Sequence, residues 1–169
     1  MFFSKFLIVF GATAASALAV PANLKHPAKA VEKRAIEDAF KLQVQGGPLD
    51  GKWVVGAYDT TGAFVDTAGE AVEFSLSSGT LQSPVGNPGI LGLPTIAWIF
   101  FDNISNPITG CSIDPVTSQL TGCTATYGST YNYDVFGAVV HDVVWAIGNS
   151  GTNWPAQDGH SFNLTAFPA

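Results

Sequence analysis

Residues 35–169 are expected to form an all-β domain, a compact antiparallel β-sandwich or β-barrel, with a β-trefoil-like arrangement as the alternative. Short runs of alternating or continuous apolar residues recur at the spacing of about 8–12 residues that is typical of such folds. Turns rich in Gly, Pro, Asn and Asp separate these runs. Residues 36–41 are the one segment with a helical alternative, a helical turn before the first strand.

The first part of this range predicts a series of strands. Residues 40–45 alternate apolar and polar side chains, which is the period of a half-buried strand. Further strands are expected at residues 53–58, 63–65, 71–76 and 80–82.

The second part begins with residues 83–94, whose three Pro and three Gly predict a surface loop. Residues 95–101 form a continuous apolar run with β-branched and aromatic side chains, which predicts a buried central strand. A polar aromatic stretch follows at residues 127–133. Two apolar runs broken by His141-Asp142 occupy residues 135–146, and a last strand is expected at residues 161–167.

Cys111 and Cys123 are the two cysteines of the chain, and they predict one disulfide. The sequence Asp114-Pro115-Val116-Thr117 between them is a type I turn signal. A hairpin closed near its base by the disulfide is therefore expected. Closing so short a loop is worth roughly 2–3 kcal/mol in the chain-entropy model.

The N-terminal residues predict a secreted precursor. Residues 1–19 have the three parts of a signal peptide: Lys5, an apolar core, and a small-x-small pattern that places cleavage after Ala19. Residues 20–34 are a polar pro-segment that ends in the dibasic pair Lys33-Arg34, which fits a kexin-type protease. The mature domain is therefore predicted to be residues 35–169, secreted to the extracellular space or the cell wall.

Charge narrows the range of partners. Residues 35–169 contain twelve Asp and Glu and two Lys, a formal charge of −10. Such a surface repels nucleic acid and anionic membranes, so neither is expected as a partner after processing.

Two glycosylation sequons fit the secretory route, one at Asn103 and one at Asn163. Asn103 lies in a turn-rich stretch, whereas Asn163 lies in the segment predicted to be the last strand.

Aromatic side chains give the best binding hypothesis, because flat rings with polar tips stack on sugars. Tyr131 and Tyr133 share one face of an extended segment that Tyr127 is expected to join, and Trp154 lies in a Gly/Asn/Pro loop. These four residues are the candidate binding residues. The other three tryptophans are expected in the core: Trp53, Trp98 and Trp145.

Catalysis and metal binding have weaker signals. Glycan hydrolysis would need a carboxylate pair, for which the candidates are Glu70 with Glu73 and Asp134 with Asp142. Glu70 and Glu73 would face opposite sides of a strand. His141-Asp142 and Asp158-Gly159-His160 contain possible metal ligands if the two segments meet. We expect no catalytic residue, no metal site and no cofactor.

A resemblance rests on the dibasic pro-segment and on several segments that follow it. These segments are residues 40–44, residues 49–54, the Phe74-x-Leu76 and Gly79-x-Leu81 units, Trp145, and residues 162–165. The chain resembles small secreted cell-surface proteins of filamentous fungi, such as the phialide-development cell-wall protein family. The resemblance implies association with the wall or surface, and it implies no catalytic residue.

The expected function is therefore that of a secreted, non-enzymatic protein of the cell wall or surface, with a structural or recognition role. A wall polysaccharide or another wall protein is the expected partner. One alternative is a secreted effector or allergen-like protein that acts on a host. The other is a small secreted glycan hydrolase.

Overall fold

The structure is a computed structural model that describes residues 39–92, 95–102, 106–128 and 131–169. Within these ranges the chain is built from antiparallel strands and contains no α-helix, so the predicted all-β class is confirmed. The predicted signal peptide, the pro-segment with its processing residues, and Asn103 lie outside the described residues. Among the described residues no helix has the length and apolar character needed to cross a membrane.

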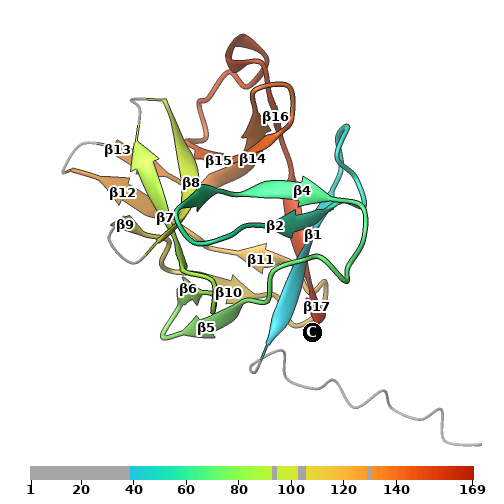
Figure 1. Ribbon diagram of the computed structural model, residues 1–169. Helices are drawn as coiled ribbons and strands as arrows, with labels where there is room; N and C mark the ends of the chain where they lie inside the picture. The colour runs from blue at the N-terminus through green and yellow to red at the C-terminus, as the bar shows by residue number, and fades with distance from the viewer. Residues whose placement is uncertain (1–38, 93–94, 103–105, 129–130) are drawn as a thin grey trace, which may run out of the picture. The chain divides into compact units, whose positions relative to one another are not determined.

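Two sheets make up most of the domain (Figure 1). The first has four strands in the order β17-β1-β2-β4, formed by Asn163–Pro168, Phe40–Gln45, Trp53–Val55 and Ala63–Val65. The second has seven strands in the order β16-β14-β15-β8-β7-β9, with β3 also paired to β8. In chain order its strands are β3 (Thr60–Thr61), β7 (Asn87–Gly92), β8 (Ile96–Asp102), β9 (Asn106–Pro107), β14 (Val135–Val139), β15 (Val144–Gly148) and β16 (His160–Ser161).

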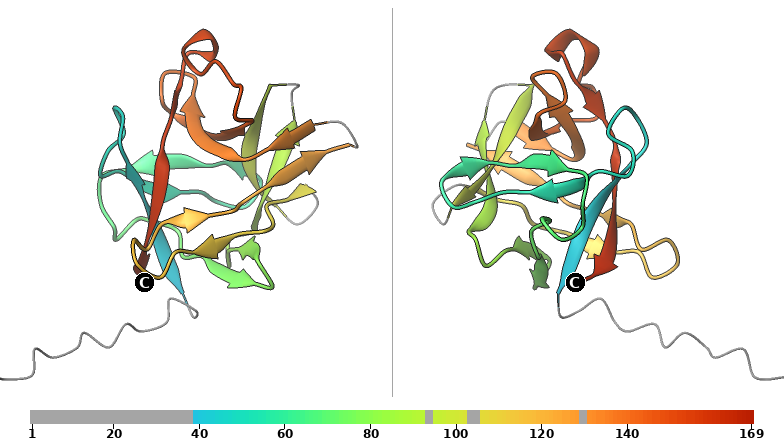
Figure 2. Two further views of the ribbon diagram at one scale, coloured as in Figure 1. Left: turned by 180° about the vertical axis from the view of Figure 1, so that it is seen from behind. Right: turned by 45° about the vertical axis from the view of Figure 1, so that its right-hand side comes forward.

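Three two-stranded hairpins complete the strand list of the described residues: β5 (Ser75–Ser77) with β6 (Thr80–Gln82), β10 (Ser112–Ile113) with β11 (Leu120–Thr121), and β12 (Ala125–Tyr127) with β13 (Tyr131–Tyr133). A short 3-10 helix, η1, spans Pro155–Gln157. Seen from behind, the β10–β11 and β12–β13 hairpins follow one another across the same side of the domain (Figure 2).

The core lies between the inner faces of the two large sheets. β1 alternates buried and half-buried side chains along its whole length, as its sequence predicts. Residues from both sheets belong to one buried cluster, as in a sandwich. Its members include Phe40, Leu42, Val44, Val54 and Leu164 from the four-stranded sheet, and Ile99, Phe101, Phe136, Trp145 and Ile147 from the seven-stranded sheet.

The chain crosses between the two sheets at Gly62. Its N–H donates to the Ile99 carbonyl at 2.8 Å, and its carbonyl accepts from the Trp145 N–H at 2.8 Å. A Cβ at position 62 would lie 2.7 Å from the Trp145 ring, so glycine is required there. The link between β3 and β4 is therefore bonded to two neighbouring strands of the seven-stranded sheet, β8 and β15.

The prediction of a loop at residues 83–94 is wrong for most of its described part. Residues 87–92 form β7, which pairs along its whole length with β8 and also with β9. The prolines and glycines do not break this strand, because Pro88 still accepts a hydrogen bond through its carbonyl, from the Ile108 N–H. The backbone of Gly86 packs directly against the backbone of Phe101. A Cβ at position 86 would lie 2.9 Å from the Phe101 backbone, so a side chain has no room there.

Smaller differences concern the ends of elements. The strand predicted at residues 71–76 is observed at Ser75–Ser77, after an isolated bridge between Phe74 and Phe40. The strand predicted at residues 53–58 ends at Val55. Residues 39–41 are not helical, because Phe40 already belongs to β1.

Candidate functional site

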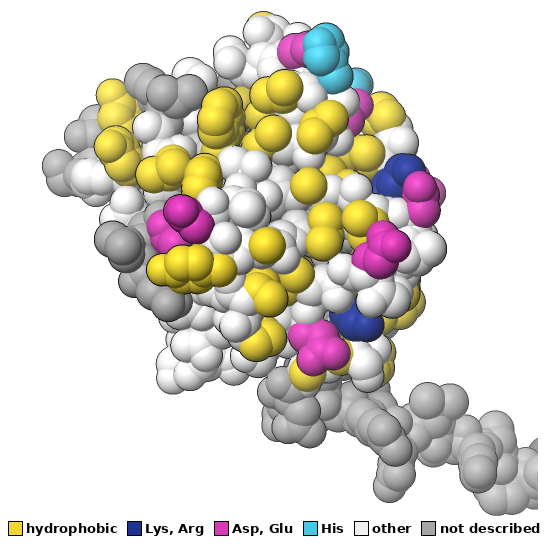
Figure 3. All heavy atoms as spheres, in the orientation of Figure 1, with side chains coloured by type: hydrophobic (Ala, Val, Ile, Leu, Met, Phe, Trp, Pro, Cys, Tyr) yellow, Lys and Arg dark blue, Asp and Glu magenta, His cyan; other side chains and the backbone are white. Residues whose placement is uncertain are grey.

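The surface of the domain is sparsely charged. On the face shown in Figure 3, acidic side chains stand apart from one another, and hydrophobic and uncharged polar side chains fill the space between them. Contacts with a partner on this surface would therefore involve rings, hydroxyls and amides more than charges.

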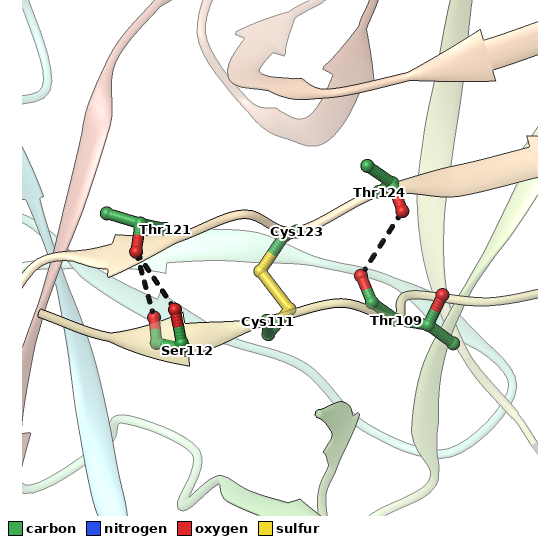
Figure 4. The surroundings of a disulfide bond; sticks show 6 residues. All are labelled: Thr109, Cys111, Ser112, Thr121, Cys123 and Thr124. Carbon is green, nitrogen blue, oxygen red and sulfur yellow. Dashed lines mark hydrogen bonds between the residues drawn. A yellow bond between two sulfur atoms is a disulfide. The ribbon is translucent and has the colours of Figure 1, made fainter. Parts of the chain in front are cut away.

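The disulfide predicted between Cys111 and Cys123 is formed, and it lies next to the β10–β11 hairpin (Figure 4). The turn is capped by Asp114, whose Oδ1 accepts from the N–H groups of Val116 and Thr117 at 2.8 and 2.7 Å. On the other side of the disulfide, Thr109 and Thr124 exchange two backbone hydrogen bonds of 2.8 and 2.7 Å. The covalent bond therefore fixes the start of the strand that continues into β12.

The β12–β13 hairpin carries the candidate site. Tyr127 and Tyr131 are directly opposite each other in its register, as are Ala125 and Tyr133. All four side chains share one face, which is buried at the base of the hairpin and exposed near its turn. Tyr127 is 43% exposed and Tyr131 is 37% exposed.

The Tyr127 ring rests on the backbone of Gly92, the last residue of β7. A Cβ at position 92 would lie 2.5 Å from Cγ of Tyr127, so the contact requires glycine. One side of the Tyr127 ring is thus supported by the domain. Opposite residues in an antiparallel pair have Cβ atoms about 5 Å apart, so the two side chains begin at neighbouring positions on one face of the hairpin.

Tyr133 is fully buried, so the prediction that it contacts a partner is wrong. Burial first, and then the neighbouring phenols of Tyr131 and Tyr127, raise the pKa of Tyr133 above its ordinary value of 10.0. Tyr133 therefore anchors the hairpin on which the two exposed tyrosines stand.

Trp154 is 6% exposed, so its prediction as a surface binding residue is also wrong. Its indole covers two glycines of the seven-stranded sheet, because Cβ atoms at Gly137 and Gly148 would lie 2.5 and 2.9 Å from it. Trp154 belongs to a second buried cluster with Ile96, Val139 and Ala146.

Of the tryptophans predicted in the core, Trp145 is fully buried. Trp53 is half-buried and forms an edge contact with Phe167, with 5.3 Å between the ring centroids. Trp98 is 39% exposed, which contradicts its predicted core position.

Trp98 is an exposed aromatic residue that the sequence analysis missed. It lies opposite Leu91 in the β7–β8 register, and Leu91 is 49% exposed. Trp98 points to the face opposite Ala97 and Ile99, but the continuous apolar run of residues 95–101 gives no sequence signal that this face is exposed at Trp98. Its exposed neighbour Leu91 was missed as well, because β7 was predicted to be a loop.

The carboxylates proposed for hydrolysis do not form a convincing pair. Asp134 precedes β14 and Asp142 follows it, so an extended strand of roughly 3.3 Å per residue separates them. Glu70 lies in a turn and Glu73 lies in the irregular stretch before β5, and both are exposed to solvent.

The two His-containing segments do meet, but as separate pairs. Nδ1 of His141 lies 2.9 Å from an Asp158 oxygen, and Nδ1 of His160 lies 2.8 Å from an Asp142 oxygen. Among the residues that the structure describes, no three His, Cys, Asp or Glu side chains gather in a way that would hold a metal ion.

Asn163 is exposed in β17, opposite Gln45 of β1, where a glycan would project from the outer face of the four-stranded sheet.

Comparisons with known proteins give no further guide to the site. No protein-family model matches the sequence, and neither the search of curated proteins nor the search of solved structures found a match.

Proposed function

We propose that the protein is secreted and non-enzymatic, and that it binds a neutral polysaccharide of the cell wall or surface through Tyr127 and Tyr131. One observation carries this proposal: two exposed tyrosines lie directly opposite each other on one face of the β12–β13 hairpin. The resemblance to small surface proteins of filamentous fungi adds the expected cellular setting.

The chemistry of tyrosine suits a sugar ligand. Its ring presents a flat apolar surface to the C–H groups of a sugar ring, while its hydroxyl bonds to sugar hydroxyls. Tyrosine also loses little conformational entropy on binding, because only two side-chain torsions are fixed. Residues flanking the pair, Gly92, Thr126 and Asn132, are uncharged.

The two exposed tyrosines lie on a rigid support, which also favours binding. Contact with Gly92 holds Tyr127, buried Tyr133 holds the hairpin, and the disulfide precedes β12. Preorganisation of this kind lowers the entropic cost of association. A formal charge of −10 over residues 35–169 disfavours anionic polymers, so a neutral glucan or chitin is the proposed ligand.

Secretion is proposed on three grounds. The disulfide is typical of proteins that fold in an oxidising compartment. The N-terminal residues have the pattern of a signal peptide, and a dibasic pair follows them.

Co-sedimentation with insoluble β-glucan and with chitin tests the binding proposal. Protein beginning at Ala35 should sediment with one of the two polymers. The double variant Tyr127→Ala/Tyr131→Ala should lose at least about tenfold in affinity, since stacking on each ring is worth on the order of 1 kcal/mol.

Two controls separate the possible causes of lost binding. Tyr58→Ala removes a tyrosine that is 60% exposed on a different turn, and it should bind like the unaltered protein. Tyr127→Phe/Tyr131→Phe keeps both rings and should retain most of the affinity. Equal binding by the Ala double variant, with its fold confirmed by circular dichroism, would disprove the role of the pair.

A further inference from the structure

The outer face of the seven-stranded sheet, which points away from the shared core, is covered by a loop over part of its width. Over β14 and β15 the Trp154 indole lies against Gly137 and Gly148. Farther across the sheet, Trp98 of β8 is 39% exposed and Leu91 of β7 is 49% exposed. An apolar part of the outer face is therefore in contact with solvent, which is a common mark of a binding surface.

The exposed side chains form one continuous surface. Trp98 and Leu91 are directly opposite each other in the β7–β8 register, so they project from the same face of the sheet. Half-buried Phe100 follows two positions after Trp98 and shares that face. We call Leu91, Trp98 and Phe100 the Trp98 surface.

The strands around the Trp98 surface carry almost no charge. β7, β14 and β15 contain no titratable side chain, and β8 has one, Asp102 at its last position. An uncharged aromatic surface fits a neutral polysaccharide, since an indole stacks on the C–H groups of a sugar ring. A second copy of the chain fits less well, because a formal charge of −10 makes two copies of residues 35–169 repel each other.

The Trp98 surface and the tyrosine pair use opposite faces of the β7–β8 strands. β12, which carries Tyr127, lies beside β7 (Figure 1). Gly92, whose missing side chain makes room for the Tyr127 ring, is opposite Ala97, and Ala97 belongs to the main core. Leu91 and Trp98 are the chain neighbours of Gly92 and Ala97, and successive side chains of a strand point to opposite faces. A sugar chain that lies flat on the tyrosine pair therefore does not reach the Trp98 surface.

We propose that the Trp98 surface is a second binding site for the same class of neutral polysaccharide, so that one domain bridges two polymer chains. The choice of ligand rests on the proposed function of the tyrosine pair. Two sites on one rigid domain also raise the apparent affinity for an insoluble polymer, because the second contact forms at a high effective concentration. Bridging gives the protein a structural role in a wall as well as a binding role.

Clumping of β-glucan or chitin particles tests the bridge. Protein that begins at Ala35 is added to a dilute suspension, and light scattering follows the particle size. Unaltered protein should clump the particles of the polymer that it binds. Trp98→Leu keeps an apolar side chain on the sheet but removes the ring, so it should bind at least about fivefold more weakly and should not clump them.

The matched control is Phe167→Leu. Phe167 is also 39% exposed, but it lies on β17 of the four-stranded sheet. This variant should bind the particles and clump them like the unaltered protein.

Acrylamide quenching of tryptophan fluorescence tests the Trp98 surface without the tyrosine pair. Trp98 is the most exposed of the four tryptophans, so acrylamide reaches it most easily. In the Tyr127→Ala/Tyr131→Ala variant, a soluble hexasaccharide of the same polymer should reduce the quenching. This measurement keeps Trp98 in place, so it decides the question even if Trp98→Leu does not fold.

The two proposals fail in different ways. The second site is disproved if Trp98→Leu clumps the particles as well as the unaltered protein does, or if the hexasaccharide leaves the quenching unchanged, whereas the tyrosine pair is judged by its own variants. Both proposals are wrong if the unaltered protein binds neither polymer. Sedimentation without polymer should show a monomer, and a dimer that Trp98→Leu dissociates would contradict the proposal, because the surface would then bind a second copy.

Discussion

Single glycines fix how closely the two sheets approach. Gly56 follows β2, and a Cβ there would lie 2.2 Å from the ring of Phe101, which is fully buried. Gly62 has the same relation to Trp145. The rings of Phe101 and Trp145 cannot shift to make space for an added methyl group, because protein interiors are closely packed.

Substituting Gly56→Ala should lower the free energy of unfolding by about 1–3 kcal/mol, the usual cost of overpacking. Urea unfolding would measure the difference. Gly69→Ala is the matched control, because Gly69 is exposed and has no atom within 4 Å of a built Cβ. Equal stability of the two variants would show that Phe101 can be displaced without cost.

Tyr133 should make the protein sensitive to alkali. Its pKa is raised in the folded state by burial and by Tyr131 and Tyr127, so the folded state keeps a proton that the unfolded state loses near pH 10. This contribution to stability is complete below about pH 10 and is lost as the pH rises further. Urea unfolding at pH 8 and pH 11 should show a smaller loss for Tyr133→Phe than for the unaltered protein.

Among the elements, the disulfide hairpin should contribute most to stability for its length. Cys111 and Cys123 are separated by 12 positions, and closing such a loop is worth about 3 kcal/mol in the chain-entropy model. The variant Cys111→Ser/Cys123→Ser should lose that amount in urea unfolding. A loss below about 0.5 kcal/mol would mean that the turn at Asp114 alone holds the hairpin.

Trp154 and Trp98 should differ strongly in their effect on stability. Trp154→Ala removes a buried indole over two glycines and should cost about 3–5 kcal/mol. Trp98→Ala should cost at most about half as much, because 39% of Trp98 is already exposed. The reverse order in thermal or urea unfolding would contradict the assignment of the two residues.

The elements that were predicted correctly are marked by patterns within their own residues. β1 follows from the alternation of residues 40–45, and the β10–β11 hairpin follows from two cysteines and an aspartate turn. β7 was missed because Pro88 and its glycines are strand breakers in isolation, whereas β8 and β9 on either side stabilise it.

The candidate site was predicted in part, for a similar reason. Tyr127 and Tyr131 do share one face, but they lie on opposite strands of a hairpin, where the sequence predicted a single extended segment. Burial of Trp154 depends on Gly137 and Gly148, which leave a space that no local pattern reveals. Burial of Tyr133 likewise depends on which end of the hairpin meets the domain.

At the level of the domain, charge and surface chemistry agree with a neutral ligand. Residues 35–169 carry twelve acidic groups and two lysines, and the hairpin residues next to Tyr127 and Tyr131, Thr126 and Asn132, are uncharged. The affinity for a neutral polysaccharide should therefore depend little on charge interactions. We expect binding to polysaccharide to change less than about twofold between 50 mM and 500 mM NaCl, because salt screens only charge interactions.

Fractionation of the producing cells tests the central claim most directly. The medium, the salt-extractable wall and the resistant wall would be separated, and mass spectrometry would read the N-terminus and any glycan at Asn103 or Asn163. We predict protein that begins at Ala35 and remains in the wall, and a Tyr127→Ala/Tyr131→Ala variant that shifts to the medium. Unaltered protein found free in the medium would contradict the account.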